Sequence, residues 1–225
     1  MNRVLAVVEG QTEQTFVREV LAPVLAVCGV YLTARLVGKP GHKGGVGRYE
    51  RARKDFVALL KQEEGTIVTS MFDYYGMPES WPGRRRANRV RHDQKARIVE
   101  GAIKEDIART LGITFDQRRL MPYVQMHEFE SLLFSEPSAL GRVMREPESA
   151  QQLQQMRDEF ETPEEINDNP VTAPSKRIER LFPSYRKALH GILAAERIAL
   201  EVMRSECPHF HDWLTALEGL GTAGD

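Results

Sequence analysis

The stretch VLAVVEGQTE, residues 4–13, decides the fold class of this chain. Its five apolar residues, Val4 to Val8, are typical of a buried strand, and apolar side chains follow at helical spacing over residues 14–28. The chain therefore turns from a strand into a helix at Glu9 and Gly10, which places Glu9 at the carboxyl end of a strand. In open α/β sheets, ligands bind in the crevice beyond these ends.

The turn after this strand carries two carboxylates at a place where dinucleotide-binding folds carry glycines for phosphate. Carboxylate oxygens suit a hard divalent cation, so Glu9 and Glu13 are candidate metal ligands. The alternative is structural, because both acids would favour the start of the helix, with Thr12 as its cap. This stretch alone favours neither interpretation.

The composition is that of an ordinary globular protein, with 41% hydrophobic and 28% charged residues among 225. The net charge of -1 gives no general attraction to nucleic acid, so such contacts must come from local patches. Cys28 and Cys207 are too few for a disulfide framework or a thiolate zinc site, and we expect a cytoplasmic protein. The opening apolar run is too short to span a membrane and lacks a signal peptide's cleavage pattern.

Strand and helix patterns alternate in the first part of the chain and only helical patterns follow it, which predicts crossover units and a mostly parallel sheet. We expect an α/β core over residues 1–135, a mainly helical region over 136–219 and a flexible tail at 220–225. Strands are expected at 4–8, 31–37, 66–72 and 119–125, and helices at 13–27, 48–63, 88–111, 127–134, 137–145, 149–161, 174–193 and 194–205.

Further acids follow two later strands of the predicted sheet. Asp73 ends the third strand, and Glu128 and Glu130 follow the last one. Carboxyl ends of parallel strands meet at one edge, where several carboxylates repel one another unless a cation such as Mg²⁺ or Mn²⁺ binds. The alternatives are that Asp73 is a turn residue and that the two glutamates start a helix, on which they would not share a face.

Basic residues provide candidate phosphate contacts. Lys43 and Arg48 lie in or beside a glycine-rich loop whose amides could approach an anion, although the loop lacks the P-loop order. Arg84, Arg85 and Arg86 begin a dense cationic run that either follows a nucleic-acid backbone or is a solvated helix face.

A further phosphate contact is expected at a predicted helix start. Ser175 and Lys176 follow Pro174 there, and would bind phosphate through backbone amides and an ammonium group. The alternative is an exposed lysine in an ordinary first turn.

A glutamate after the first strand, an aspartate after a later one and a third acidic segment resemble the Toprim fold of topoisomerases, primases and overcoming-lysogenization-defect nucleases. More closely, over roughly residues 4–181, the chain looks like an uncharacterised bacterial Toprim-like family. That family is similar to RloB-type proteins, which are associated with ABC- or SMC-like ATPases in phage-defence loci. The runs that carry the resemblance are VEGQTE, FDYYGMP, WPG, YVQMHEFESLLF, ETPEEIN and APSKRI.

The resemblance implies a metal-dependent phosphodiesterase or nuclease that acts on DNA or RNA, with Glu9 as the Toprim glutamate. Asp73 would be the first aspartate of the Asp-x-Asp motif, and Lys176 would offset charge on the scissile phosphate. Tyr75 occupies the position of the second aspartate, so Glu128 or Glu130 would have to replace that ligand.

The tyrosine leaves open a different class of function, a catalytically inactive Toprim-like subunit that regulates an ATPase. A third alternative is a sensor of a small phosphorylated ligand in the same crevice. The sequence leaves the oligomeric state open.

Overall fold

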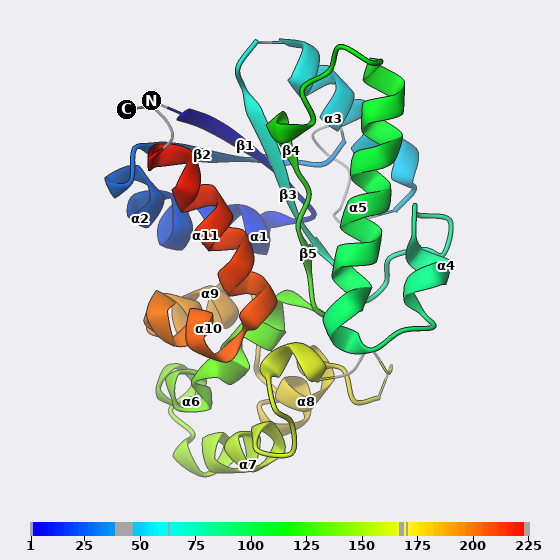
Figure 1. Ribbon diagram of the computed structural model, residues 1–225. Coiled ribbons are helices and arrows are strands. Elements are labelled where there is room, and N and C mark those ends of the chain that lie inside the picture. Colours follow the sequence, from blue (N-terminus) through cyan, green and yellow to red (C-terminus); the bar gives the residue numbers. More distant parts are fainter. Residues whose placement is uncertain (1, 39–46, 63, 167–168, 170, 223–225) are drawn as a thin grey trace. The chain divides into compact units, whose positions relative to one another are not determined.

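A computed structural model describes residues 2–38, 47–62, 64–166, 169 and 171–222 of the chain (Figure 1). The chain forms two compact units, which we call unit 1 and unit 2. Unit 1 comprises Met1–Gln125 and Ala216–Asp225, and unit 2 comprises Met126–Thr215. The domain limits predicted from the sequence, at residues 135 and 219, stay predictions.

Unit 1 is built on a parallel sheet with the strand order β2-β1-β3-β4, and β5 also pairs with β3. This arrangement confirms the mostly parallel sheet that the sequence predicts. The central strand β3 is buried on both faces, as its β-branched and apolar run requires. The strands are β1 (Asn2–Val8), β2 (Val30–Leu36), β3 (Ile67–Asp73), β4 (Leu120–Met121) and β5 (Val124–Gln125).

Pro122 separates β4 from β5 within the single strand that we expected at residues 119–125, because proline has no N–H for the ladder. The hydroxyl of Ser70 on β3 replaces part of the missing pairing. It donates to the carbonyl of Tyr123 at 3.0 Å and accepts the N–H of the same residue at 3.0 Å.

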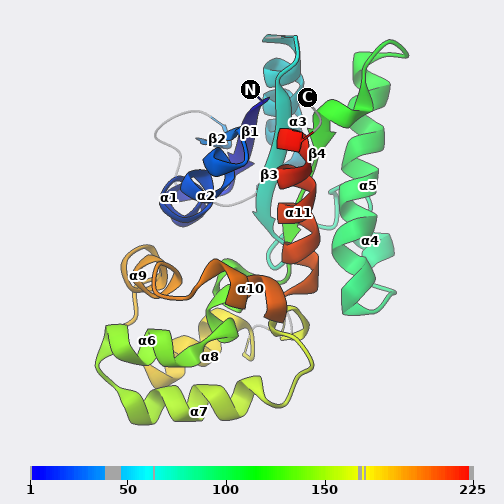
Figure 2. The same cartoon turned by 60° about the vertical axis from the view of Figure 1, so that its left-hand side comes forward.

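Helices flank the sheet of unit 1 on both sides: Figure 2 shows α1 and α2 on one side and α3 and α5 on the other. The helix predicted at 13–27 is a continuous segment in which a π-helical turn, Val17–Leu21, ends two residues before Pro23. The helices are α1 (Gln11–Phe16), α2 (Ala22–Val27), α3 (Tyr49–Gln62), α4 (Arg84–Ala87) and α5 (His92–Leu111).

The regular elements of unit 2, among its described residues, are all helices, which confirms the helical region predicted after the sheet. The helix expected at residues 127–134 is a 3-10 helix, Phe129–Ser135. The α-helices of unit 2 are α6 (Pro137–Met144), α7 (Pro147–Arg157), α8 (Pro174–Leu181), α9 (Ile192–Ala195) and α10 (Leu200–Glu206). The unit also contains the 3-10 helices Phe129–Ser135 and Pro163–Glu165 and the π-helical turn Lys187–Gly191. The last helix, α11 (Pro208–Thr222), belongs to unit 2 up to Thr215 and to unit 1 beyond it.

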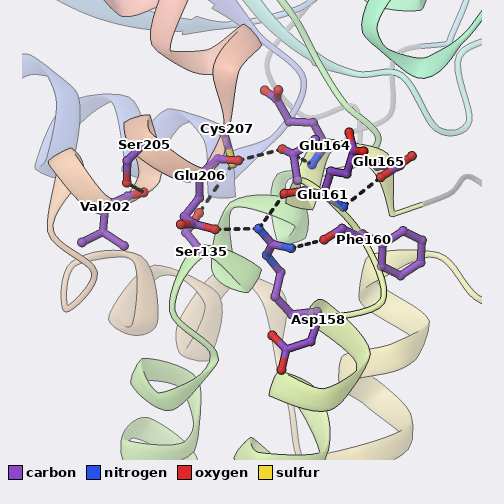
Figure 3. Close-up of polar contacts among 12 residues, drawn as sticks. Ser135, Asp158, Phe160, Glu161, Glu164, Glu165, Val202, Ser205, Glu206 and Cys207 are labelled. Atoms are coloured by element: carbon purple, nitrogen blue, oxygen red, sulfur yellow. Dashed lines mark hydrogen bonds and ion pairs between the residues drawn. The ribbon is translucent and has the colours of Figure 1, made fainter.

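The buried guanidinium of Arg157 stabilises the loop that follows α7 in unit 2. Arg157 donates to the carbonyls of Phe160 at 2.6 Å and Glu161 at 3.2 Å. It also pairs with the Glu206 carboxylate at 2.6 Å. Figure 3 labels the residues that carry these three acceptors, Phe160, Glu161 and Glu206. Nearby, Glu164 accepts the first N–H groups of α11. These charges therefore hold loops and helix ends together.

No helix in the described part of the chain combines the length and the apolar character that crossing a bilayer requires.

Candidate functional site

Two of the predicted acids lie together at the carboxyl edge of the unit 1 sheet. Glu9 directly follows β1 and Asp73 ends β3, and these strands are neighbours with Val8 in register with Met71. Oε2 of Glu9 accepts a hydrogen bond from the backbone N–H of Asp73 at 3.3 Å. Asp73 is only 6% exposed, and Glu9 is half-buried. The fold thus brings together two residues that are far apart in the sequence.

Glu13 lies in the first turn of α1 and is 3% exposed. A Cβ added at Gly10 would stand 3.1 Å from Oε2 of Glu13, so this carboxylate folds back over the turn between β1 and α1. The N-cap of α1 is Gly10, so the structural alternative was wrong in taking Thr12 as the cap. Because Gly10 has no side chain, the carboxylate of Glu13 fits beside this turn.

The chemistry of these donors fits a hard divalent cation, because each offers carboxylate oxygens and the site is largely shielded from water. Within the described ranges, no group of three or more histidine, cysteine, aspartate or glutamate side chains is close enough to hold a metal ion. The fit therefore rests on Glu9 and Asp73, with Glu13 beside the same turn. Tyr75, which the resemblance aligns with the second Toprim aspartate, is half-buried in the turn after β3.

The three arginines of α4, which the sequence predicts as phosphate contacts, differ in their surroundings. Arg84 is 8% exposed, stacks on the ring of Tyr74 at 3.9 Å and donates to that tyrosine's hydroxyl at 2.7 Å. Arg85 and Arg86 are exposed, as is Arg48 before α3. The structure therefore places Arg84 in the packing of a turn and leaves its neighbours accessible to a polyanion.

Lys43, the other predicted phosphate contact of unit 1, lies outside the described residues.

In unit 2, Glu128 lies at the amino end of α8. Its carboxylate accepts the backbone N–H of Ser175 at 2.8 Å and the hydroxyl of Ser175 at 3.1 Å. A negative charge is stabilised at this end of a helix, where N–H groups lack partners within the helix. The amide that the sequence predicts as a phosphate donor thus binds a carboxylate of the same unit.

Glu130 is enclosed in unit 2 with 1% exposure, and the ammonium of Lys187 lies 3.1 Å from its carboxylate. Burial raises the pKa of Glu130, Lys187 counteracts the shift and Glu128 adds to it. Burial, followed by the charge of Glu130, also raises the pKa of Tyr185. Lys187 and Tyr185 were missed by the sequence reasoning, since no motif or spacing links them to Glu130.

Lys176 is in the first turn of α8, where its ammonium pairs with Glu179 at 2.7 Å and its side chain is 46% exposed. Its predicted contact with phosphate, like that of Ser175, stays a prediction.

Residues 8–218 match the family described as "Domain of unknown function (DUF4276)". The comparison with curated proteins gives no match. Two solved structures are similar, and both are of the C-terminal region of the Xanthomonas campestris pv. campestris OLD protein.

The structure phased with platinum has a TM-score of 0.50 at 18% identity, over 99% of this chain and 95% of that chain. The structure phased with iodine has a TM-score of 0.47 at 18% identity, over 99% and 97% of the two chains. At this identity the likeness concerns the fold alone. It agrees with the Toprim-like α/β class that the sequence predicts.

Proposed function

The chain belongs to the family described as "Domain of unknown function (DUF4276)", and we propose that it is a metal-dependent phosphodiesterase or nuclease of the Toprim type. The observation that carries the proposal is the pairing of Glu9 with Asp73 at the ends of neighbouring parallel strands. This edge of an open α/β sheet is where ligands bind. The shared fold with the OLD C-terminal region supports the same class.

Glu9 and Asp73 would hold Mg²⁺ or Mn²⁺, and Glu13, beside the same turn, is a further candidate ligand. A bound cation of this kind polarises a phosphodiester and lowers the pKa of an attacking water. The chain's own contribution is to hold the two carboxylates in a fixed, shielded arrangement before substrate arrives, since Asp73 is almost fully buried and its N–H orients Glu9.

The substrate class follows from the exposed cations of unit 1. Arg85 and Arg86 offer guanidinium groups that match phosphate geometry, as does Arg48. We propose DNA or RNA as the substrate, bound through its backbone. The roles that the resemblance implies for Glu128, Glu130 and Lys176, all of unit 2, stay predictions, separate from the pair of carboxylates in unit 1.

The test is cleavage of labelled DNA and RNA by the purified full-length chain with Mn²⁺ or Mg²⁺. Wild-type protein should nick at least one of them, and Glu9→Gln and Asp73→Asn should each abolish cleavage. Glu196→Gln is the matched control, because that glutamate is exposed and lies in unit 2. Circular dichroism confirms that each variant is folded, and wild-type rates in both site variants would refute the proposal.

A second candidate is a catalytically inactive Toprim-like subunit that regulates an ABC- or SMC-like ATPase. Two observations favour it, namely Tyr75 at the second aspartate position and the lack of a three-residue ligand group within the described ranges. This candidate predicts a stable complex with an ATPase encoded beside it and no Mn²⁺ binding by calorimetry. Tight Mn²⁺ binding that Glu9→Gln abolishes would decide against it.

A further inference from the structure

The strand β2 forms an edge of the unit 1 sheet and, among the described strands, pairs with β1 alone. The N–H of Asn2 bonds to the carbonyl of Gly29 at 3.2 Å, and the N–H of Val37 bonds to the carbonyl of Val8 at 2.9 Å. Backbone groups alternate in direction along a parallel strand, so the odd-numbered residues of β2 face β1. The outward N–H and C=O groups therefore belong to Val30, Leu32, Ala34 and Leu36.

Large exposed apolar side chains are found on β2 and on the neighbouring helix α2. Val24 and Val27 of α2 are 38% and 88% exposed, and Tyr31 and Leu36 of β2 are 45% and 37% exposed. The helix α2 packs directly against β2, and we call the two elements together the α2–β2 surface. Side chains alternate along a strand, so Tyr31 and Leu36 lie on opposite faces of β2. An exposed strand edge beside apolar side chains is a template for pairing with another chain.

We propose that this edge binds a second copy of the chain, with the two β2 strands antiparallel about a twofold axis at Thr33. Leu32 would then exchange two backbone hydrogen bonds with Ala34 of the second copy, and Val30 would do so with Leu36. This register uses all outward groups of the seven-residue strand. The unit 1 sheets of the two copies would then form one continuous sheet.

The side chains favour a second copy in this register. Tyr31 would lie opposite Arg35 of the second copy in a pair without backbone bonds, where side chains approach most closely. A guanidinium on a tyrosine ring is a favourable cation–π contact, and Thr33 would face its own counterpart. Within one strand, Tyr31 and Arg35 are about 13 Å apart at about 3.3 Å per residue, so they complement each other only between copies. The net charge of -1 opposes self-association little.

Sedimentation equilibrium on the full chain should show a concentration-dependent dimer. Ala34→Pro should weaken it at least about tenfold, since two outward N–H groups are lost per dimer while the ladder to β1 remains. Ile113→Ser is the control, because that side chain is fully exposed outside the surface and its loss should change nothing. A chain that stays monomeric at about 100 µM would overturn the proposal.

The register, in which Tyr31 faces Arg35 of the second copy, is tested by introducing charges at these two positions. Tyr31→Arg should weaken the dimer at least about tenfold, since it places two arginines opposite each other twice per dimer. Adding Arg35→Glu should restore the dissociation constant to within about threefold of wild type. Melting temperatures separate unfolding from dissociation. A double variant no tighter than Tyr31→Arg alone refutes the antiparallel pairing at Thr33.

A cross-link gives an independent measurement. In a Cys28→Ser background, Thr33→Cys should form a disulfide-linked dimer under mild oxidation, because facing residues of such pairs have Cα atoms about 4.5 Å apart. Ile113→Cys in the same background is the control for random collision. Equal rates of cross-linking in the two variants would count against the twofold axis.

Discussion

Glu128 accepts both the backbone N–H and the hydroxyl of Ser175, at 2.8 Å and 3.1 Å, and so occupies the amino end of α8 with a carboxylate. Both residues belong to unit 2, although they are far apart in the sequence. The bond provides a partner for an N–H that has none within the helix. It also joins the start of the 3-10 segment to α8, so that a residue singled out for chemistry supports the fold.

Removing this carboxylate should therefore destabilise the protein. Glu128→Ala leaves the partly buried N–H and hydroxyl of Ser175 without their acceptor, and we expect the free energy of unfolding in urea to fall by about 1–3 kcal/mol. Glu179→Ala is the control, since its pair with Lys176 is half exposed and should contribute at most about 0.5 kcal/mol. Equal losses in the two variants would show that the bond contributes little.

The buried carboxyl of Glu130 should make stability depend on pH. Its pKa is raised by burial, so above the usual value of about 4.5 the folded protein keeps a proton that the unfolded chain releases. This contribution to stability is fully present below that usual value and is lost as the pH rises through the folded-state pKa. Melting temperatures measured from pH 4.5 to 8 should fall more steeply for wild type than for Glu130→Gln.

Glu196→Gln should keep the wild-type slope with pH, because that side chain is exposed. The ammonium of Lys187 and the carboxylate of Glu128 act on the pKa of Glu130, and Glu130 acts on that of Tyr185. Glu196→Gln therefore controls for the loss of a carboxyl outside this group. Identical slopes in all three proteins would contradict the prediction.

If nucleic acid is the substrate, the exposed arginines of α4 should set the salt dependence of binding. The double variant Arg85→Ala/Arg86→Ala should lower the slope of log affinity against log salt by about two, at about 0.9 per duplex phosphate contact. Fluorescence anisotropy with catalytically inactive Asp73→Asn protein measures it without cleavage. Arg118→Ala removes an exposed guanidinium that pairs with Asp116, and should leave the slope unchanged.

The sheet and the meeting of Glu9 with Asp73 could be predicted from the sequence because both follow from short-range patterns. An apolar run such as Val4 to Val8 identifies a strand, and alternation with helices makes neighbouring strands parallel. Parallel strands place their carboxyl ends at one edge, so acids at those ends meet without any further information.

The partners of the unit 2 acids could not be predicted in this way. Whether Glu130 is buried against Lys187 depends on how separate helices pack, and no local period encodes it. The pairing of Glu128 with Ser175 likewise joins distant segments. The helix α11 was not predicted, although Pro208 occupies its first position, where proline commonly starts a helix.

Replacing glycine by alanine should lower the stability at Gly141 and raise it at Gly101. A Cβ at Gly141 of α6 would stand 2.4 Å from the Cβ of Ala150 on α7, so Gly141→Ala must push these helices apart and should cost about 1–3 kcal/mol. A Cβ at Gly101 of α5 meets nothing within 4 Å, so Gly101→Ala should stabilise by about 0.5–1 kcal/mol through helix propensity.

The double variant Gly141→Ala/Ala150→Gly tests the cause at Gly141, because it moves the methyl group from one helix to the other and removes the clash. Urea unfolding should show that it recovers part of the loss, less about 1 kcal/mol for a glycine within α7. A double variant whose loss equals the sum of the two single losses would mean that the helices do not meet at this pair. The cost at Gly141 would then have to come from its own helix.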